Sequence, residues 1–92
     1  MRVRDVRSDA LGTENARIDV IFEDESVWKI RNTADPFGLG RRQWTLERPD
    51  GTVVERPGNS ALAGIALLLT NHMDPEDVAV IIKRLGNAWP RV

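Results

Sequence analysis

The sequence predicts an α+β fold in which a four-stranded antiparallel β-meander is followed by two C-terminal α-helices packed on one face of the sheet. Two observations predict it. Between residues 16 and 56, short segments alternate apolar and polar side chains and are separated by turn-forming residues. From residue 57 onwards, apolar residues recur with helical spacing. A chain of 92 residues can bury one modest core, so we expect a single domain over 1–92.

The first two predicted strands form a hairpin over residues 16–31, with an acidic turn at 23–25. Alternation places every second side chain of a strand on the same face of the sheet. Ile21 is the exception, because it is apolar in the polar phase. The residues of the apolar phase are Ile18, Val20, Phe22, Trp28 and Ile30.

Two further strands are predicted over 42–48 and 52–55, around the turn-forming segment Pro49-Asp50-Gly51. Trp44 and Leu46 carry the apolar phase of the third strand. The sequence leaves open a fifth strand at the sheet edge over residues 2–7, where Val3 is the only residue expected to anchor it well.

The first predicted helix covers residues 60–71, after an N-cap at Asn59 or Ser60, and residues 61–70 carry no charge. A helix that is apolar on all sides must be covered on two sides. The sheet can cover one side, and either the second helix or another protein chain must cover the other. One face carries Leu62, Ile65, Ala66 and Leu69, and the other carries Ala61, Gly64, Leu67 and Leu68.

The second predicted helix covers residues 75–85. Asp74 is the expected N-cap, Pro75 occupies the first helical position, and Gly86 is expected to end the helix. The spacing of its apolar residues predicts one buried stripe, formed by Val78, Ile81, Ile82 and Leu85.

The composition disfavours an enzyme. The chain contains no cysteine and a single histidine, His72, and no serine lies in a nucleophile motif. His72, Asp74 and Glu76 could hold a metal in principle, but carboxylates at a helix start have a simpler role in stabilising the helix dipole. We therefore expect no catalytic residue, no metal and no cofactor.

The segment 32–42 contains two large apolar residues, Phe37 and Leu39, followed by Arg41 and Arg42. The sequence leaves two alternatives: the apolar side chains are tucked under the sheet, or they are presented to a partner beside the arginines. A phosphate cradle is disfavoured because this glycine-containing segment precedes a strand and not a helix N-terminus.

These features predict a small non-enzymatic protein–protein interaction protein. The 11 arginines against two lysines suggest a GC-rich genome, and we expect a protein of a phage or mobile element that acts on a host protein. A homodimer through helix 60–71 is a linked expectation. The candidate partner-binding residues are Phe37, Leu39, Arg41, Arg42, Gly64, Leu67 and Leu68.

The alternative function is a nucleic-acid-binding accessory or regulatory protein that uses the arginine-bearing sheet. A net charge of −1 and an acidic start to the second helix disfavour it, because both repel phosphates. We also expect a cytoplasmic protein with no membrane association. The charged segment 1–7 does not resemble a signal peptide, and the apolar stretch 61–69 is far shorter than the ~20 residues of a spanning helix.

Overall fold

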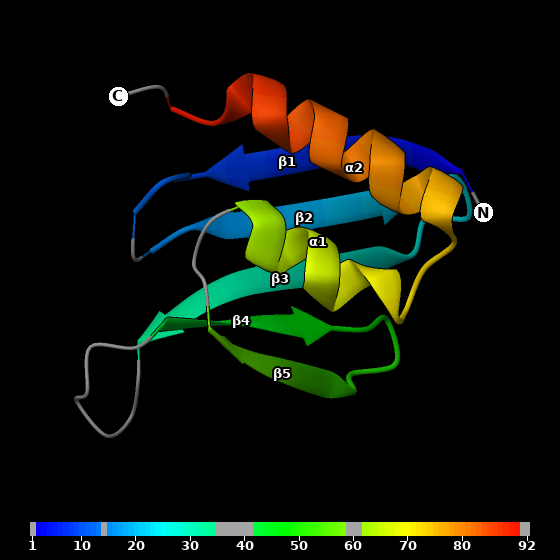
Figure 1. The fold of residues 1–92 in the computed structure, drawn as a ribbon. Coiled ribbons are helices and arrows are strands. Elements are labelled where there is room, and N and C mark those ends of the chain that lie inside the picture. The colour runs from blue at the N-terminus through cyan, green and yellow to red at the C-terminus, as the bar shows by residue number, and fades with distance from the viewer. Residues whose placement is uncertain (1, 14, 35–41, 59–61, 91–92) are drawn as a thin grey trace.

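The computed structural model describes residues 2–13, 15–34, 42–58 and 62–90. It confirms the predicted α+β fold, with five antiparallel strands followed by two C-terminal helices that cover one face of the sheet (Figure 1). The strands lie in the order β1-β2-β3-β4-β5, so each one pairs with its neighbour in sequence. The elements are β1 (Val3–Asp9), β2 (Arg17–Phe22), β3 (Val27–Ala34), β4 (Arg42–Glu47), β5 (Val53–Gly58), α1 (Leu62–Thr70) and α2 (Pro75–Ala88).

The edge strand that the sequence left open is present as β1, and it has a bulge. Val3 pairs with Phe22, but Asp5 pairs with Ile21, so Arg4 is an extra residue between these two pairs. Val3 and Val6 would face opposite sides of a regular strand. The bulge allows both to pack against the core. The expectation that Val3 alone anchors this strand was therefore wrong, because period-two alternation does not foresee a bulge.

The core lies between the sheet and the helices, and the apolar phase predicted for β2, β3 and β4 forms its sheet side. Ile21 is also buried, but it has the opposite phase and is not part of the core cluster. It pairs with Val27 on β3. The buried cluster contains Ala16, Ile18, Val20, Phe22, Trp28, Ile30, Trp44, Leu46, Ile65, Leu68, Leu69, Ile81 and Leu85.

The two helices run antiparallel to each other over the inner face of the sheet (Figure 1). The helix α2 contacts β1, whereas α1 contacts β4 and β5 and also packs against α2. The predicted end of α2 at Gly86 was wrong, since the helix continues to Ala88. A Cβ atom built on Gly86 would lie 3.6 Å from Leu62 Cδ2, so this glycine faces α1 within the helix pair and is not a cap.

Side-chain hydrogen bonds close two of the hairpin turns. In the β2–β3 turn, the carboxylate of Asp24 accepts hydrogen bonds from the hydroxyl and the backbone N–H of Ser26. In the β4–β5 turn, Asp50 accepts one from the backbone N–H of Thr52 at 2.8 Å. These bonds favour the ionised carboxylates and lower the pKa of Asp24 and of Asp50 below the ordinary value of 3.8.

Candidate functional site

The structure narrows the partner-binding surface predicted on α1. Gly64 and Leu68 are buried within the molecule, so neither can contact a partner as predicted. Their burial follows from the position of α1, which packs on both the sheet and α2. Leu67 faces outward, with 53% of its surface exposed.

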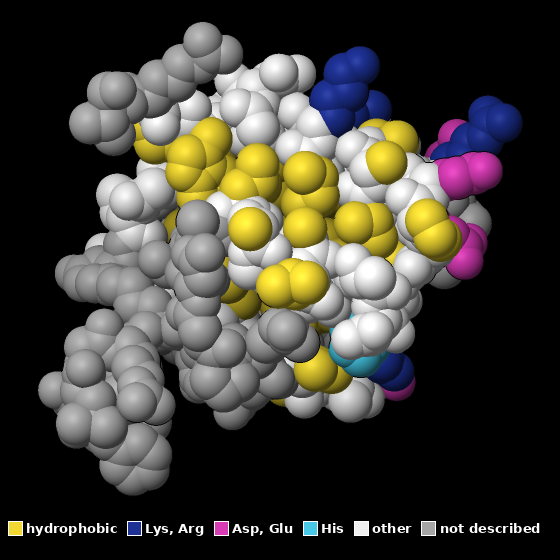
Figure 2. Space-filling model, in the orientation of Figure 1, with side chains coloured by type: hydrophobic (Ala, Val, Ile, Leu, Met, Phe, Trp, Pro, Cys, Tyr) yellow, Lys and Arg dark blue, Asp and Glu magenta, His cyan; other side chains and the backbone are white. Residues whose placement is uncertain are grey.

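The helix α2 adds a residue that was not among the candidates. Val80 is 38% exposed. The helices are antiparallel, and Leu62 of α1 faces Gly86 of α2. Leu67 comes five residues after Leu62, and Val80 comes six residues before Gly86, so the two residues lie at about the same height along the helix axes. Apolar side chains gather across the helices on the face shown in Figure 2. The exposure of Val80 confirms its predicted position on the outward side of α2, outside the buried stripe.

Three of the predicted loop residues, Phe37, Leu39 and Arg41, lie outside the described residues. Arg42 is the first residue of β4, where its backbone pairs with Ala34 on one side and Gly58 on the other.

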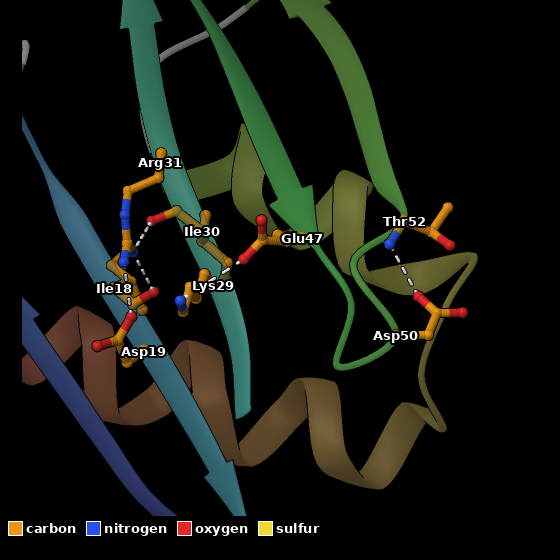
Figure 3. Close-up of polar contacts among 8 residues, drawn as sticks. All are labelled: Ile18, Asp19, Lys29, Ile30, Arg31, Glu47, Asp50 and Thr52. Carbon is orange, nitrogen blue, oxygen red and sulfur yellow. Dashed lines mark hydrogen bonds and ion pairs between the residues drawn. The ribbon is translucent and has the colours of Figure 1, made fainter. Parts of the chain in front are cut away.

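The outer face of the sheet, which the helices do not cover, carries ion pairs between neighbouring strands. The guanidinium of Arg31 on β3 donates a hydrogen bond to Asp19 on β2 at 2.9 Å, and it also donates to the carbonyls of Ile18 and Ile30 (Figure 3). Lys29 lies 3.7 Å from Glu47 on β4. Arg31, one of the arginines predicted to form a nucleic-acid surface, is thus matched by a carboxylate on the adjacent strand, and so is Lys29.

A polar cluster that the sequence did not foresee joins the sheet to the connection between the helices. Arg48 follows β4, and its guanidinium bonds to Nδ1 of His72 and lies 6.0 Å from the ring centroid of Trp28. A guanidinium can only donate, so Nδ1 of His72 acts as the acceptor. His72 therefore has a structural partner here. Within the described residues, no group of three or more His, Cys, Asp and Glu side chains could hold a metal ion.

This cluster borders a cavity of about 340 Å³ at the end of the sheet where β2 turns into β3. Its sheet side is aromatic, because Phe22 and Trp28 line it with ring centroids 6.3 Å apart in an edge-to-face arrangement. Its helix side is polar and includes Asp77, which is only 8% exposed. The remaining lining residues are Thr70, Asn71, His72, Met73 and Asp74.

Several buried polar atoms have no hydrogen-bond partner among the described residues. Two of them, Nε1 of Trp28 and Nε of Arg48, lie at the cavity end of the inner face. The other two are Nε1 of Trp44 and Oδ1 of Asn32, and these residues pair with each other across β4 and β3. Unpaired buried polar atoms are uncommon and costly, so they often mark a place where water or a ligand binds. Burial of these atoms depends on tertiary packing, which residue type alone does not reveal.

Comparisons with known proteins found no match: no family model, no curated protein and no solved structure is similar to this chain. Among the described residues, no helix has both the length and the apolar character needed to cross a membrane.

Proposed function

We propose that this chain is a small non-enzymatic interaction protein that binds another protein through the outward face of its helix pair. The observation that carries the proposal is Leu67, which leaves 53% of its surface in water on a helix without a single charged residue. Complete burial of a leucine side chain stabilises by roughly 1.5–3 kcal/mol, so covering the exposed part of Leu67 would favour association.

The neighbourhood of Leu67 supports the same surface. Ala63, one turn before Leu67 on α1, is also exposed, as is Ala79 on α2. Small side chains around one large apolar residue permit close approach of a partner. We propose that the partner is a host protein and that the chain is encoded by a phage or mobile element, and the identities of the neighbouring genes test this origin.

The charge pattern favours a protein partner over nucleic acid. Arg31 and Lys29 on the outer face are matched by Asp19 and Glu47, and matched charges displace few counterions from a phosphate backbone. A mobility-shift assay at low salt is therefore expected to show no binding. A shift that weakens when Arg41 and Arg42 are neutralised would instead support the nucleic-acid alternative.

Affinity purification from the native host, followed by measurement of the dissociation constant with the purified partner, tests the proposal. L67E is expected to weaken binding at least ~10-fold, because it places a charge in an apolar contact. Val53 offers a matched control, since it is 52% exposed but lies on β5. V53E is expected to bind as the wild type does. Equal binding by wild type and L67E would contradict the proposal.

Two further variants define the extent of the surface. If α1 also forms a homodimer, light scattering at tens of micromolar will give a dimer for the wild type and a monomer for L67E. The Phe37→Ala, Leu39→Ala double variant tests whether the segment 32–42 belongs to the surface, because retention of every wild-type partner would exclude that segment.

A further inference from the structure

The cavity beside Trp28 is lined by the connection between the two helices and by residues next to the β2–β3 turn. Figure 1 shows that this connection and this turn lie at the same end of the sheet. The cavity's volume of about 340 Å³ is near the lower end of the range for ligand sites, which suits a group of side-chain size. Leu67 and Val80 are not among its lining residues. The following inference therefore does not rest on the proposed function.

Asp77 is the unusual residue of this cavity. It is 8% exposed, and within the described residues its carboxylate forms no hydrogen bond and no ion pair. Its place in the first turn of α2 offsets part of the cost of burying a charge, because the helix dipole is positive there. A buried carboxylate still gains from a charged partner.

The second carboxylate of the cavity is also available. Asp74 occupies the N-cap position of α2, but its side chain makes no capping hydrogen bond. The structure therefore confirms that Asp74 is the N-cap residue, but its side chain does not form the capping hydrogen bond. Asp74 and Asp77 together give the helix side of the cavity two carboxylates that no described cation neutralises.

The other groups around the cavity fit the same ligand. Arg48 bonds to His72 and lies over the ring of Trp28, two residues of the cavity lining, and among the described ion pairs it has none with Asp77. Among the described residues that line the cavity, none is a lysine or an arginine. The rings of Phe22 and Trp28 offer an apolar wall, and aromatic rings attract cations.

We propose that this cavity binds an organic cation, an ammonium or guanidinium group carried on an apolar stem. Asp77 is the counter-ion, Asp74 is a second acceptor nearer the mouth, and Trp28 and Phe22 pack against the stem. Such a group exists in a free alkylamine and in a lysine or arginine side chain. The shared chemistry is a positive charge on a narrow apolar chain.

NMR titration of the ¹⁵N-labelled full chain tests this site. The probe is N-acetyl-lysine methylamide, with the norleucine analogue as an uncharged control of similar shape. The indole N–H signal of Trp28 reports on the cavity, and those of Trp44 and Trp89, which do not line it, are internal references. We expect the lysine probe to shift the Trp28 signal with a dissociation constant on the order of millimolar, and the norleucine analogue to bind at least ~10-fold more weakly.

Charge-removing variants identify the counter-ion. D77N is expected to weaken binding of the lysine probe at least ~10-fold, and D74N, at an exposed residue, about threefold. D9N is the matched control, because Asp9 is exposed at the opposite end of the β1–β2 pair and should leave binding unchanged. If D77N does not fold, two other measurements test the proposal. Binding of the lysine probe should weaken in D74N, and binding by the wild type should weaken as the salt concentration rises.

Further probes separate the sources of the cation. Butylammonium represents a free amine, and N-acetyl-arginine methylamide represents an arginine side chain. Binding of any of these cations in preference to the norleucine analogue supports the site. The proposal is overturned if no cation shifts Trp28 at about 50 mM, if norleucine shifts it equally, or if D77N binds as the wild type does.

Discussion

The helices α1 and α2 cover the same face of the sheet but have different surfaces. The first has no charged residue, whereas the second carries Glu76, Lys83 and Arg84 on its exposed side. Both bury a stripe of aliphatic residues in the common core. The burial of α2 follows directly from its amphipathic pattern, but the burial of α1 depends on where its neighbours lie.

This difference separates residues that stabilise the fold from residues that are free to bind. On α2, an exposed polar residue costs nothing and needs no partner. On α1, no position before Thr70 is polar, so an outward residue such as Leu67 remains a cost until another surface covers it. The same pair of helices therefore contains one surface adapted to water and one with surplus apolar area.

Truncation of the core residues should give the largest effect. Leu69 of α1 and Leu85 of α2 are 0% and 1% exposed, so L69A and L85A should each lower the free energy of unfolding by about 2–5 kcal/mol. L67A should change it by less than ~0.5 kcal/mol, because surface substitutions cost little. Urea denaturation measures all three. Equal costs for L67A and L69A would show that α1 does not bury the face described above.

Loss of the contact between the helix connection and the sheet should have a smaller effect. H72A removes the acceptor of Arg48 and leaves a partly buried guanidinium with one partner fewer, at a cost of about 1–2 kcal/mol. N71A is the control, since Asn71 is the exposed neighbour. Denaturation of the two variants compares them directly, and a similar cost for both would mean that the Arg48–His72 bond does not stabilise the fold.

Substitution of Gly86, which faces α1, should have a smaller effect than loss of the Arg48–His72 bond, and it should stabilise the fold. Alanine is favoured over glycine within a helix, and a methyl group at Gly86 would lie at an ordinary contact distance of 3.6 Å from Leu62. G86A should therefore raise the free energy of unfolding by about 0.5–1 kcal/mol. G51A should lower it by about 1–2 kcal/mol, because Gly51 has a φ of +88°. Destabilisation by G86A in thermal unfolding would show that the helices approach more closely than described.

Much of the fold was predictable from local patterns. The alternation around Val20, Trp28 and Leu46 identified the inner face of the sheet, and the spacing of Ile81 and Leu85 identified the buried stripe of α2. Each of these patterns repeats within a few residues and reflects one backbone period. The candidate surface was less predictable, because no period distinguishes Leu67 from Leu68 on a helix that is apolar on all sides.

The sequence by itself determined the class of the fold, the order of its elements and the core phase of β2, β3 and β4. Tertiary structure alone decided that a bulge at Arg4 turns Val3 and Val6 to the core, and that α1 buries Leu68 and exposes Leu67. It also decided that Asp77 is buried beside an aromatic cavity. The physical reason is that periodicity is a property of one segment, whereas burial depends on which other segments pack against it.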